Sequence, residues 1–379
     1  MDWKILVGAP LIAAAASCSL GRFTGIAPNA DVREQQPRGT LISTAAMQVS
    51  RAAHTATALT DGRVLVAGGF IEEASPQGAE VYEPGAGQFA PLPPMVTRRH
   101  SHTATLLPNG KVLIAGGYGA GAATLAAAEL FDPATNSFSP TGSLLTARAN
   151  HVAIPLATGK VLIAGGEGSG WTFLASAELY DPFTGRFSST GSLTTPRGGH
   201  AGVRLPDGRV LIVGGHNGQR RNLTILASAE IYDPATGMFT RAGAMGVPRH
   251  KHDAVLLSNG PVLITGGSDD RDDRGIYNST ELFDWKTGVF IPGPAMRLGR
   301  FKHRGASVVL PSGLALIAGG APQAEIYDAA SRSFAIVPGQ PRMAGSFSAV
   351  APLKDGGVLI AGGYGNGAGP RSSAWLYRP

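Results

Sequence analysis

The chain is poor in cysteine, charge and aromatic side chains: one residue is cysteine, 15% are charged and 7% are aromatic. The cysteine, Cys18, lies in an N-terminal segment that we expect to be processed, so disulfides and thiol chemistry cannot support the rest of the chain. The 32 basic residues exceed the 26 acidic ones only slightly, and they form no basic block. The composition therefore argues against a nucleic-acid partner.

The first 18 residues have the features of an export signal. Lys4 precedes an apolar run, Ile5–Ala16, that is too short to remain as a membrane span. The run leads into Ser17-Cys18, and small residues before a lone cysteine resemble the lipobox of bacterial lipoproteins. This resemblance implies lipidation at Cys18 and a place in the cell envelope, in the outer membrane or facing the periplasm of a Gram-negative cell. A plain signal peptide with secretion is the alternative. Residues 19–39 are expected to be a flexible tether.

Seven apolar runs in the remainder end in a Gly-Gly pair, and the pairs recur at intervals of 43 to 53 residues. Such a period is typical of a repeat architecture. The 53 glycines and 27 prolines, without any long 3.6-residue periodicity, indicate many short strands joined by turns. One repeated domain over residues 40–379 is therefore expected. The pairs are Gly68-Gly69, Gly116-Gly117, Gly165-Gly166, Gly214-Gly215, Gly266-Gly267, Gly319-Gly320 and Gly362-Gly363.

The third repeat shows the pattern within one unit. It predicts four strands, which we designate a to d, at His151–Leu156, Lys160–Ala164, Ala177–Tyr180 and Arg186–Ser188. In four other units Asp-Gly or Asn-Gly separates strands a and b, as two-residue hairpins require. Four antiparallel strands repeated radially predict the blade of a β-propeller.

The spacing of the strands predicts how the ring closes. An aromatic residue on strand d stands ten residues before the arginine that opens the next unit, as Phe187 does before Arg197. Counting back in the same way from Arg51 places an orphan strand d near Thr40–Ser43. The last unit stops after its strand c, Ala374–Tyr377. We therefore predict an all-β, seven-bladed propeller in which the N-terminal strand d completes the C-terminal blade and removes an open edge.

The repeats resemble the kelch family over residues 40–379, through Gly-Gly after strand b, segments like Glu-Leu-Tyr-Asp-Pro on strand c and an aromatic residue on strand d. The Arg-x-x-His opening is most similar to the seven-bladed propellers of galactose oxidase and glyoxal oxidase. Those copper enzymes use a Cys–Tyr crosslinked radical cofactor and a Tyr-His pair. Here only Cys18 is present and none of the eight tyrosines precedes a histidine. We therefore expect no copper-radical chemistry and no cofactor.

One face of the ring is expected to carry a binding site. The b–c loops and the d–a segments share this face, and the b–c loops are longest in blades 4 and 5 and shortest in blade 6. Variable loops on a rigid scaffold are a usual basis for binding. An asymmetric pocket near the central channel is therefore predicted.

Arg-x-x-His opens six units, and a strand-c glutamate recurs with the same period. The arginines could form a basic crown that binds carboxylates or sulfates, or they could pair with the glutamates inside the blades. We favour the pairing, because buried charges persist only when they are paired. Blade 7 carries Trp375 at the glutamate position, and we place Arg342 at its arginine position with Gly345 at its histidine position. Arg342 is then the best candidate for ligand binding.

Further candidates are polar residues on the same face. The periodic histidines are spread around a ring and cannot converge on a metal. The loop Asp269–Asp273 contains an arginine and lacks EF-hand spacing, so no metal site is expected. The remaining candidate ligand-binding residues are Arg98, His100, His216, Arg220, Arg221, His250, Lys251, Lys302 and Arg304.

These observations favour a lipid-anchored, extracytoplasmic binding module over an enzyme. Its expected partner is an anionic glycan, or an acidic peptide or protein, bound on the b–c/d–a face. The alternative is a copper-independent carbohydrate-active enzyme, of isomerase or lyase type, that acts at the channel mouth of that face. A structural envelope protein without a small ligand is a third interpretation. The absence of a recognisable catalytic motif is weak evidence against acid–base chemistry, which needs only a few well-placed residues.

Overall fold

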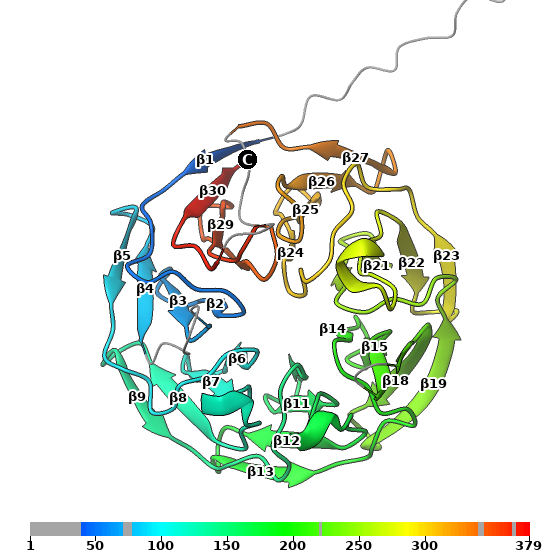
Figure 1. The fold of residues 1–379 in the computed structure, drawn as a ribbon, viewed down its shortest axis with the longest axis horizontal. Helices are drawn as coiled ribbons and strands as arrows, with labels where there is room; N and C mark the ends of the chain where they lie inside the picture. Colours follow the sequence, from blue (N-terminus) through cyan, green and yellow to red (C-terminus); the bar gives the residue numbers. More distant parts are fainter. Residues whose placement is uncertain (1–38, 71–77, 220–221, 340–344, 366–368) are drawn as a thin grey trace, which may run out of the picture. The chain divides into compact units, whose positions relative to one another are not determined.

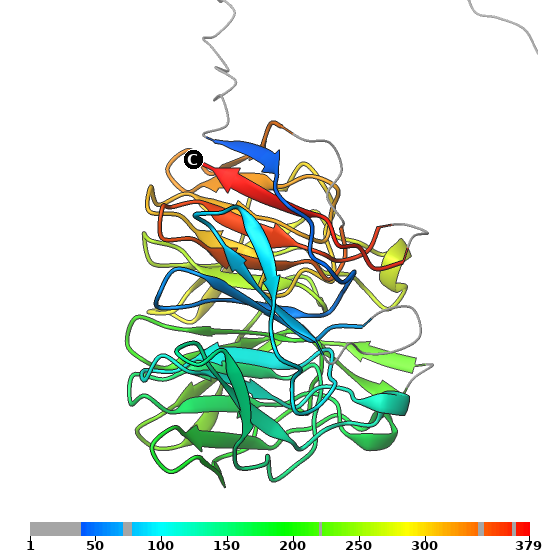
Figure 2. The same ribbon diagram turned by 90° about the vertical axis from the view of Figure 1, so that its left-hand side faces the viewer.

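The computed structural model describes residues 39–379 except 71–77, 220–221, 340–344 and 366–368. The predicted signal segment, Cys18 and all but the last residue of the predicted tether lie outside the described residues. Seven four-stranded antiparallel sheets form a ring, seen edge-on in Figure 2. The predicted all-β, seven-bladed propeller is therefore confirmed. Within the described ranges, no helix is long and apolar enough to cross a membrane.

Each blade runs from its strand a at the channel to its strand d at the rim (Figure 1). Blade 1 comprises β2 (Thr55–Ala58), β3 (Val64–Ala67), β4 (Ala79–Glu83) and β5 (Gln88–Pro91). Blade 2 comprises β6 (Thr103–Leu106), β7 (Val112–Ala115), β8 (Ala128–Asp132) and β9 (Ser137–Pro140). Blade 3 comprises β10 (Val152–Pro155), β11 (Val161–Ala164), β12 (Ala177–Asp181) and β13 (Arg186–Ser189). Blade 4 comprises β14 (Ala201–Arg204), β15 (Val210–Val213), β18 (Ser228–Asp233) and β19 (Met238–Ala244).

The last three blades include the closure of the ring. Blade 5 comprises β20 (Asp253–Leu256), β21 (Val262–Thr265), β22 (Thr280–Asp284) and β23 (Val289–Pro292). Blade 6 comprises β24 (Ser307–Val309), β25 (Ala315–Ile317), β26 (Glu325–Asp328) and β27 (Ser333–Ile336). Blade 7 comprises β28 (Ala349–Pro352), β29 (Val358–Ala361), β30 (Ala374–Arg378) and the N-terminal β1 (Thr40–Ser43). Leu41 lies opposite Tyr377 and Ser43 opposite Trp375, so the predicted closure is confirmed.

The b–c loops carry the additional structure. Blades 2, 3 and 5 have short 3-10 turns, η1 (Ala120–Ala122), η2 (Ser169–Trp171) and η3 (Asp272–Arg274). Blade 4 instead extends a two-stranded hairpin, β16 (His216–Gln219) and β17 (Asn222–Ile225). These loops make the b–c/d–a face uneven.

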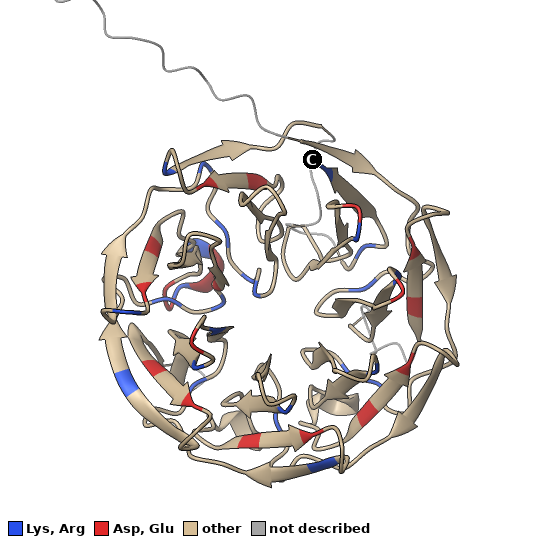
Figure 3. Ribbon diagram, turned by 180° about the vertical axis from the view of Figure 1, so that it is seen from behind, with Lys and Arg blue, Asp and Glu red and all other residues tan. Residues whose placement is uncertain are grey.

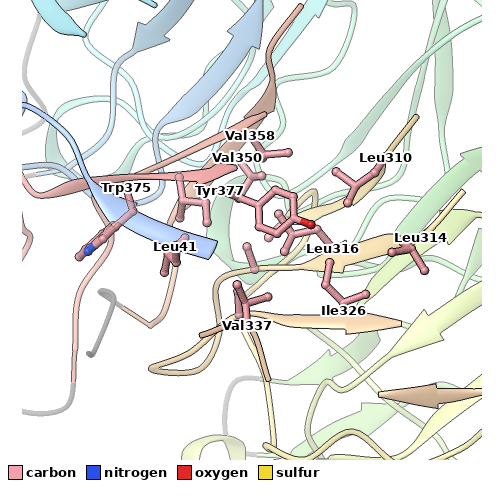
Figure 4. Packing of buried hydrophobic residues seen from close by; sticks show 14 residues of the cluster. Leu41, Leu310, Leu314, Leu316, Ile326, Val337, Val350, Val358, Trp375 and Tyr377 are labelled. Atoms are coloured by element: carbon pink, nitrogen blue, oxygen red, sulfur yellow. The ribbon is translucent and has the colours of Figure 1, made fainter. Parts of the chain in front are cut away.

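The core lies between neighbouring blades. Each strand b has sheet neighbours on both sides and a blade against each face, so its residues form a continuous apolar run instead of alternating with polar residues. All four residues of β3 are buried. At the closure, Leu41 and Tyr377 of blade 7 pack with Leu316 of blade 6 (Figure 4). The terminal strand is thus held by apolar packing as well as by strand pairing.

The Gly-Gly pairs permit the close approach of the next blade. In blade 2, Gly116 and Gly117 have φ angles of 62° and 95°, a region that favours glycine. The N–H of Gly117 donates to the carbonyl of Arg148 in blade 3 at 2.8 Å. A Cβ on Gly116 would lie 2.5 Å from that carbonyl oxygen and 2.8 Å from the His151 ring. No larger residue fits without displacing blade 3.

The six periodic arginines form buried ion pairs with the strand-c glutamates. In blade 3, Arg148 donates to Glu178 at 2.7 Å and to the carbonyls of Gly165 and Ser176. Glu178 also accepts the backbone N–H of Leu145, in the incoming d–a segment, at 2.7 Å. Figure 3 shows acidic positions recurring on successive blades around the ring. The arginines therefore serve the blades and are not a solvent-facing crown. The pairs are Arg51–Glu80, Arg99–Glu129, Arg148–Glu178, Arg197–Glu230, Arg249–Glu281 and Arg300–Glu325.

The periodic histidines lie between blades. His151 of blade 3 is hydrogen-bonded through Nε2 to the hydroxyl of Thr103 in blade 2 at 2.9 Å. His303 pairs with Thr265 of the preceding blade in the same way. Burial and the neighbouring arginine lower the pKa of His303 to about 3. It is therefore neutral at physiological pH and structural in role.

The predicted register of blade 7 is wrong. The N–H of Gly320 donates to the carbonyl of Gly345, just as the second glycine of other blades donates to the arginine carbonyl. Gly345 therefore occupies the arginine position, and Ser348 occupies the histidine position. Arg342 itself lies outside the described residues. Trp375 does stand at the glutamate position, opposite Ile360, so both charges of the pair are absent from this blade. Ten residues separate Phe187 from Arg197, but 11 separate Phe334 from Gly345. Arg342 was assigned by residue type, as an arginine near the expected position, and not by this spacing.

A candidate site at the channel mouth

Seven structurally equivalent residues encircle one end of the channel, one from each blade. All seven have left-handed φ angles of 51° to 59°: Ala53, Ser101, Asn150, Gly199, Lys251, Lys302 and Phe347. We call these seven residues the mouth ring. Among them, six backbone N–H groups donate to the carbonyl of the ring residue in the preceding blade, at 2.8–3.2 Å. The ring fixes the directions of these side chains and so gives the site a rigid frame.

A cavity of about 390 Å³ occupies the channel inside this ring. Its walls include Ala56, Ala104, Ile154, Ala254 and Val350 of the strands a. Near the ring its lining becomes polar and includes Glu167, His216, Lys251, Lys302 and Arg304. An apolar wall with a few convergent polar groups, at this volume, is typical of a small-molecule site.

Arg304 reaches the channel because blade 6 contains a two-residue insertion. In both blade 5 and blade 6 the opening arginine donates to the carbonyl of the first glycine of the Gly-Gly pair. The two residues are 17 positions apart in blade 5, Arg249 and Gly266, but 19 apart in blade 6, Arg300 and Gly319. The extra residues are Arg304 and Gly305. Arg304 donates across the channel to the Asn150 carbonyl at 2.9 Å, the ring carbonyl to which no described ring N–H donates. Asp253 holds the insertion by accepting the N–H groups of Gly305 and Ser307 at 2.8 Å each. Burial raises the pKa of Asp253.

The residue directly after each Gly-Gly pair lies beside the mouth ring. In six blades it forms a backbone bridge with the residue that precedes the ring residue, for example Glu167 with Ala149 and His216 with Gly198. This position differs from blade to blade and contributes to the chemistry of the mouth. Around the ring it is Phe70, Tyr118, Glu167, His216, Ser268, Ala321 and Tyr364.

Blades 7, 1 and 2 give the mouth an aromatic side. The ring of Phe70 lies edge-on to Tyr364 and to His100, with centroid separations of 6.1 and 5.7 Å. His100 in turn lies 5.4 Å from Tyr118, and Phe347 lies 5.7 Å from Tyr364. All five side chains are partly exposed. They present apolar ring faces, and the two tyrosine hydroxyls and the His100 imidazole add polar groups, which suits a ligand of mixed polarity.

Blades 5 and 6 give the mouth two lysines around one carboxylate. Lys251 donates to Asp272 at 2.7 Å, whereas Lys302 is 3.9 Å from the same carboxylate and donates to the Tyr364 hydroxyl at 3.2 Å. Burial opposes the ionisation of Asp272, but the two lysines outweigh it and lower its pKa. Lys302 thus directs its hydrogen bond to a neutral oxygen, as Arg304 does.

Blades 2 to 5 contribute a connected chain of acid–base groups. Tyr118 donates to Glu167, and Glu167 Oε1 faces His216 Nε2 at 3.7 Å. His216 and His250 approach through their Nδ1 atoms at 3.0 Å. Burial, then His250 and Lys251, lower the pKa of His216 to about 3, and burial and Lys251 lower that of His250 to about 4. Both histidines are neutral at physiological pH.

The structure brings five of the sequence-derived candidates together at the mouth: His216, His250, Lys251, Lys302 and Arg304. His100 joins the aromatic side, and Arg98 is exposed and does not line the cavity. Arg220, Arg221 and Arg342 lie outside the described residues.

Sequence reasoning missed Glu167, Tyr118 and Tyr364 as site residues, and it treated Asp272 only as part of a rim loop. Three of the four were accessible through a simple signal, because they directly follow a Gly-Gly pair. Within the described part of the chain, no three His, Cys, Asp or Glu side chains are grouped so as to hold a metal ion.

Comparison with known proteins agrees with this architecture. Residues 197–246 match the kelch motif. The propeller is also similar to the structure of a fungal alcohol oxidase of the AA5 family in complex with copper, with a TM-score of 0.69 and 16% identity. That alignment covers 90% of this chain and 76% of the oxidase chain, and at this identity it shows a shared fold. A search of curated proteins gives no significant match.

Proposed function

We propose that this kelch propeller is a binding module that takes a small, polar, acidic ligand, such as a sugar acid, at the channel mouth. The observation that carries the proposal is that Lys302 and Arg304 line a cavity of about 390 Å³ whose rim is partly aromatic. Both cations form hydrogen bonds to neutral oxygens, and both groups favour carboxylate partners. Aromatic faces complement the apolar face of a sugar ring.

A thermal-shift screen tests this function. A ligand that binds only the folded state raises the melting temperature by mass action. We expect D-glucuronate to raise it more than D-glucose does, and Lys302→Gln or Arg304→Gln to abolish the difference. Lys354→Gln is the matched control, because Lys354 is exposed in the a–b turn of blade 7 on the opposite face. Equal shifts in the Lys302 and Lys354 variants, or no shift with any acid, would reject the proposal and leave an acidic peptide or protein as the partner to test.

A copper-independent carbohydrate-active enzyme is the second candidate function. The observation that favours it is the carboxylate of Glu167 beside the neutral imidazole of His216 in the cavity lining. Such a pair has the reach for proton transfer to a bound ligand. Product analysis of any acid that binds distinguishes the two functions, since a binding module returns its ligand unchanged.

We further propose that the protein is held in the cell envelope by a lipid on Cys18. The support is the sequence Ala15-Ala16-Ser17-Cys18 after an apolar run. Replacing Cys18 by Ser is expected to move the protein from the membrane fraction to the soluble fraction. Equal membrane recovery of both forms would contradict the anchor.

A further inference from the structure

The hydrogen-bond pattern of the two mouth histidines fixes the positions of their protons. His250 Nε2 lies 3.1 Å from the carbonyl oxygen of Asp269, and a carbonyl can only accept, so this nitrogen carries the proton. Neutral His250 then has a lone pair on Nδ1. His216 Nδ1, 3.0 Å away, must therefore donate. Since His216 is also neutral, its Nε2 is an unprotonated acceptor.

This acceptor faces another acceptor. His216 Nε2 is 3.7 Å from Glu167 Oε1, which is too long for a direct hydrogen bond. The other oxygen of Glu167 accepts from Tyr118. Both side chains are almost fully buried, with exposures of 4% and 7%, yet both line the cavity. Two acceptors that face each other beside a cavity are suited to receive donors from a ligand.

The fold makes room for this pair at one place only among the blades. Blade 4 has Gly198 and Gly199 where the other blades carry at least one larger residue. A Cβ on Gly198 would lie 2.9 Å from Glu167 Cγ, and one on Gly199 would lie 3.0 Å from His216 Nδ1. Because Gly198 and Gly199 have no side chains, they leave the space that the two acceptors occupy.

We infer that Glu167 Oε1 and His216 Nε2 form a subsite for two neighbouring hydroxyl groups of the ligand. This inference rests on the proposed function and names its ligand class as polyhydroxy acids. Vicinal hydroxyls offer two neighbouring O–H donors, one for each acceptor. An ammonium group would also supply donors, but Lys251 and Arg304 line the same cavity and repel a cation. The carboxylate of the ligand lies toward Lys302 and Arg304.

Nitrogen NMR of the full chain with 15N-labelled histidine tests the acceptor directly. In the free protein at pH 7.5 we expect Nε2 of His216 to resonate as an unprotonated imidazole nitrogen. It should shift toward the protonated range when D-glucuronate is added, and it should stay in place with cyclohexanecarboxylate, which has the acid but no hydroxyls. A protonated Nε2 in the free protein would overturn the inference without any ligand measurement.

Glu167→Gln provides the second test. The glutamine oxygen can still accept from Tyr118, while an amide N–H group replaces the acceptor that faces His216 Nε2. The approach of two acceptors is thereby relieved, and the subsite loses one of its acceptors. We expect a higher melting temperature and at least about tenfold weaker D-glucuronate binding, which corresponds to about 1.4 kcal/mol. Glu83→Gln, at the exposed end of β4, is the control.

The ligand results separate the two proposals. Equal binding of both acids, unaffected by Glu167→Gln, would overturn the hydroxyl subsite and leave the anion-binding function intact. Failure of both acids to bind would reject the function and the subsite together.

Discussion

Glu178→Gln is expected to destabilise the folded protein strongly. The change keeps the size of the side chain and an oxygen for the Leu145 N–H, but removes the negative charge beside Arg148. That guanidinium has no exposure to solvent and would remain charged and uncompensated. Removing one partner of a buried pair costs about 3–5 kcal/mol, a large part of the 5–15 kcal/mol typical of a folded protein.

The same strand supplies a matched control. Asp181 ends β12 and lies 3.3 Å from Lys160, with the two side chains 29% and 42% exposed. Asp181→Asn removes a carboxylate from a solvent-screened pair and should leave the urea midpoint almost unchanged. Urea denaturation at pH 7.5 measures both variants through the shift of the midpoint at constant slope. Equal, small shifts for Glu178→Gln and Asp181→Asn would refute the structural role of the buried pairs.

Three further predictions follow from the packing and charge of the ring. In the folded protein His54 has a pKa lowered to about 3 and stays neutral, whereas its imidazole in the unfolded chain is protonated below about pH 6.5. The free energy of unfolding should therefore fall as the pH drops from 6.5 toward 3. Urea midpoints that do not change between pH 7 and 4.5 would contradict this prediction. Gly116→Ala should cost at least about 2 kcal/mol more than Gly121→Ala, because both glycines have left-handed φ angles but only Gly116 is packed against the next blade. Equal melting temperatures of the two variants would argue against the close-approach explanation. Gly198→Ala, which places a methyl group 2.9 Å from Glu167 Cγ, should weaken D-glucuronate binding several-fold in calorimetry, and unchanged affinity would place the ligand elsewhere.

The repeat pattern predicted the fold well because the same structural residues recur in nearly every blade. Gly-Gly, a strand-c glutamate and an opening arginine recur because each forms a fixed backbone contact, as Gly117 does with Arg148. Pairing of the arginines with the glutamates could also be anticipated, since buried charges need partners. One deviation was not anticipated: Gly345 stands at the arginine position of blade 7, whereas the search for an arginine there selected Arg342.

The site was harder to predict because it depends on what differs between blades. His250 and Lys251 were recognisable as extra charges beside the repeat. Glu167 was marked in the sequence only by its place after a Gly-Gly pair, and its role arises from its approach to His216 across a blade boundary. The reach of Arg304 across the channel follows from a two-residue insertion whose direction only the folded ring determines. In a periodic sequence the residues shared by the repeats can be recognised easily, whereas contacts between residues that differ from the repeat pattern require the folded structure.

A crystal structure of the protein soaked with D-glucuronate would test the central claim most directly. The account predicts ligand density in the cavity inside the mouth ring, with the carboxylate on Lys302 and Arg304 and neighbouring hydroxyls on Glu167 and His216. Density on the opposite face of the ring, or an empty channel at saturating ligand, would contradict it.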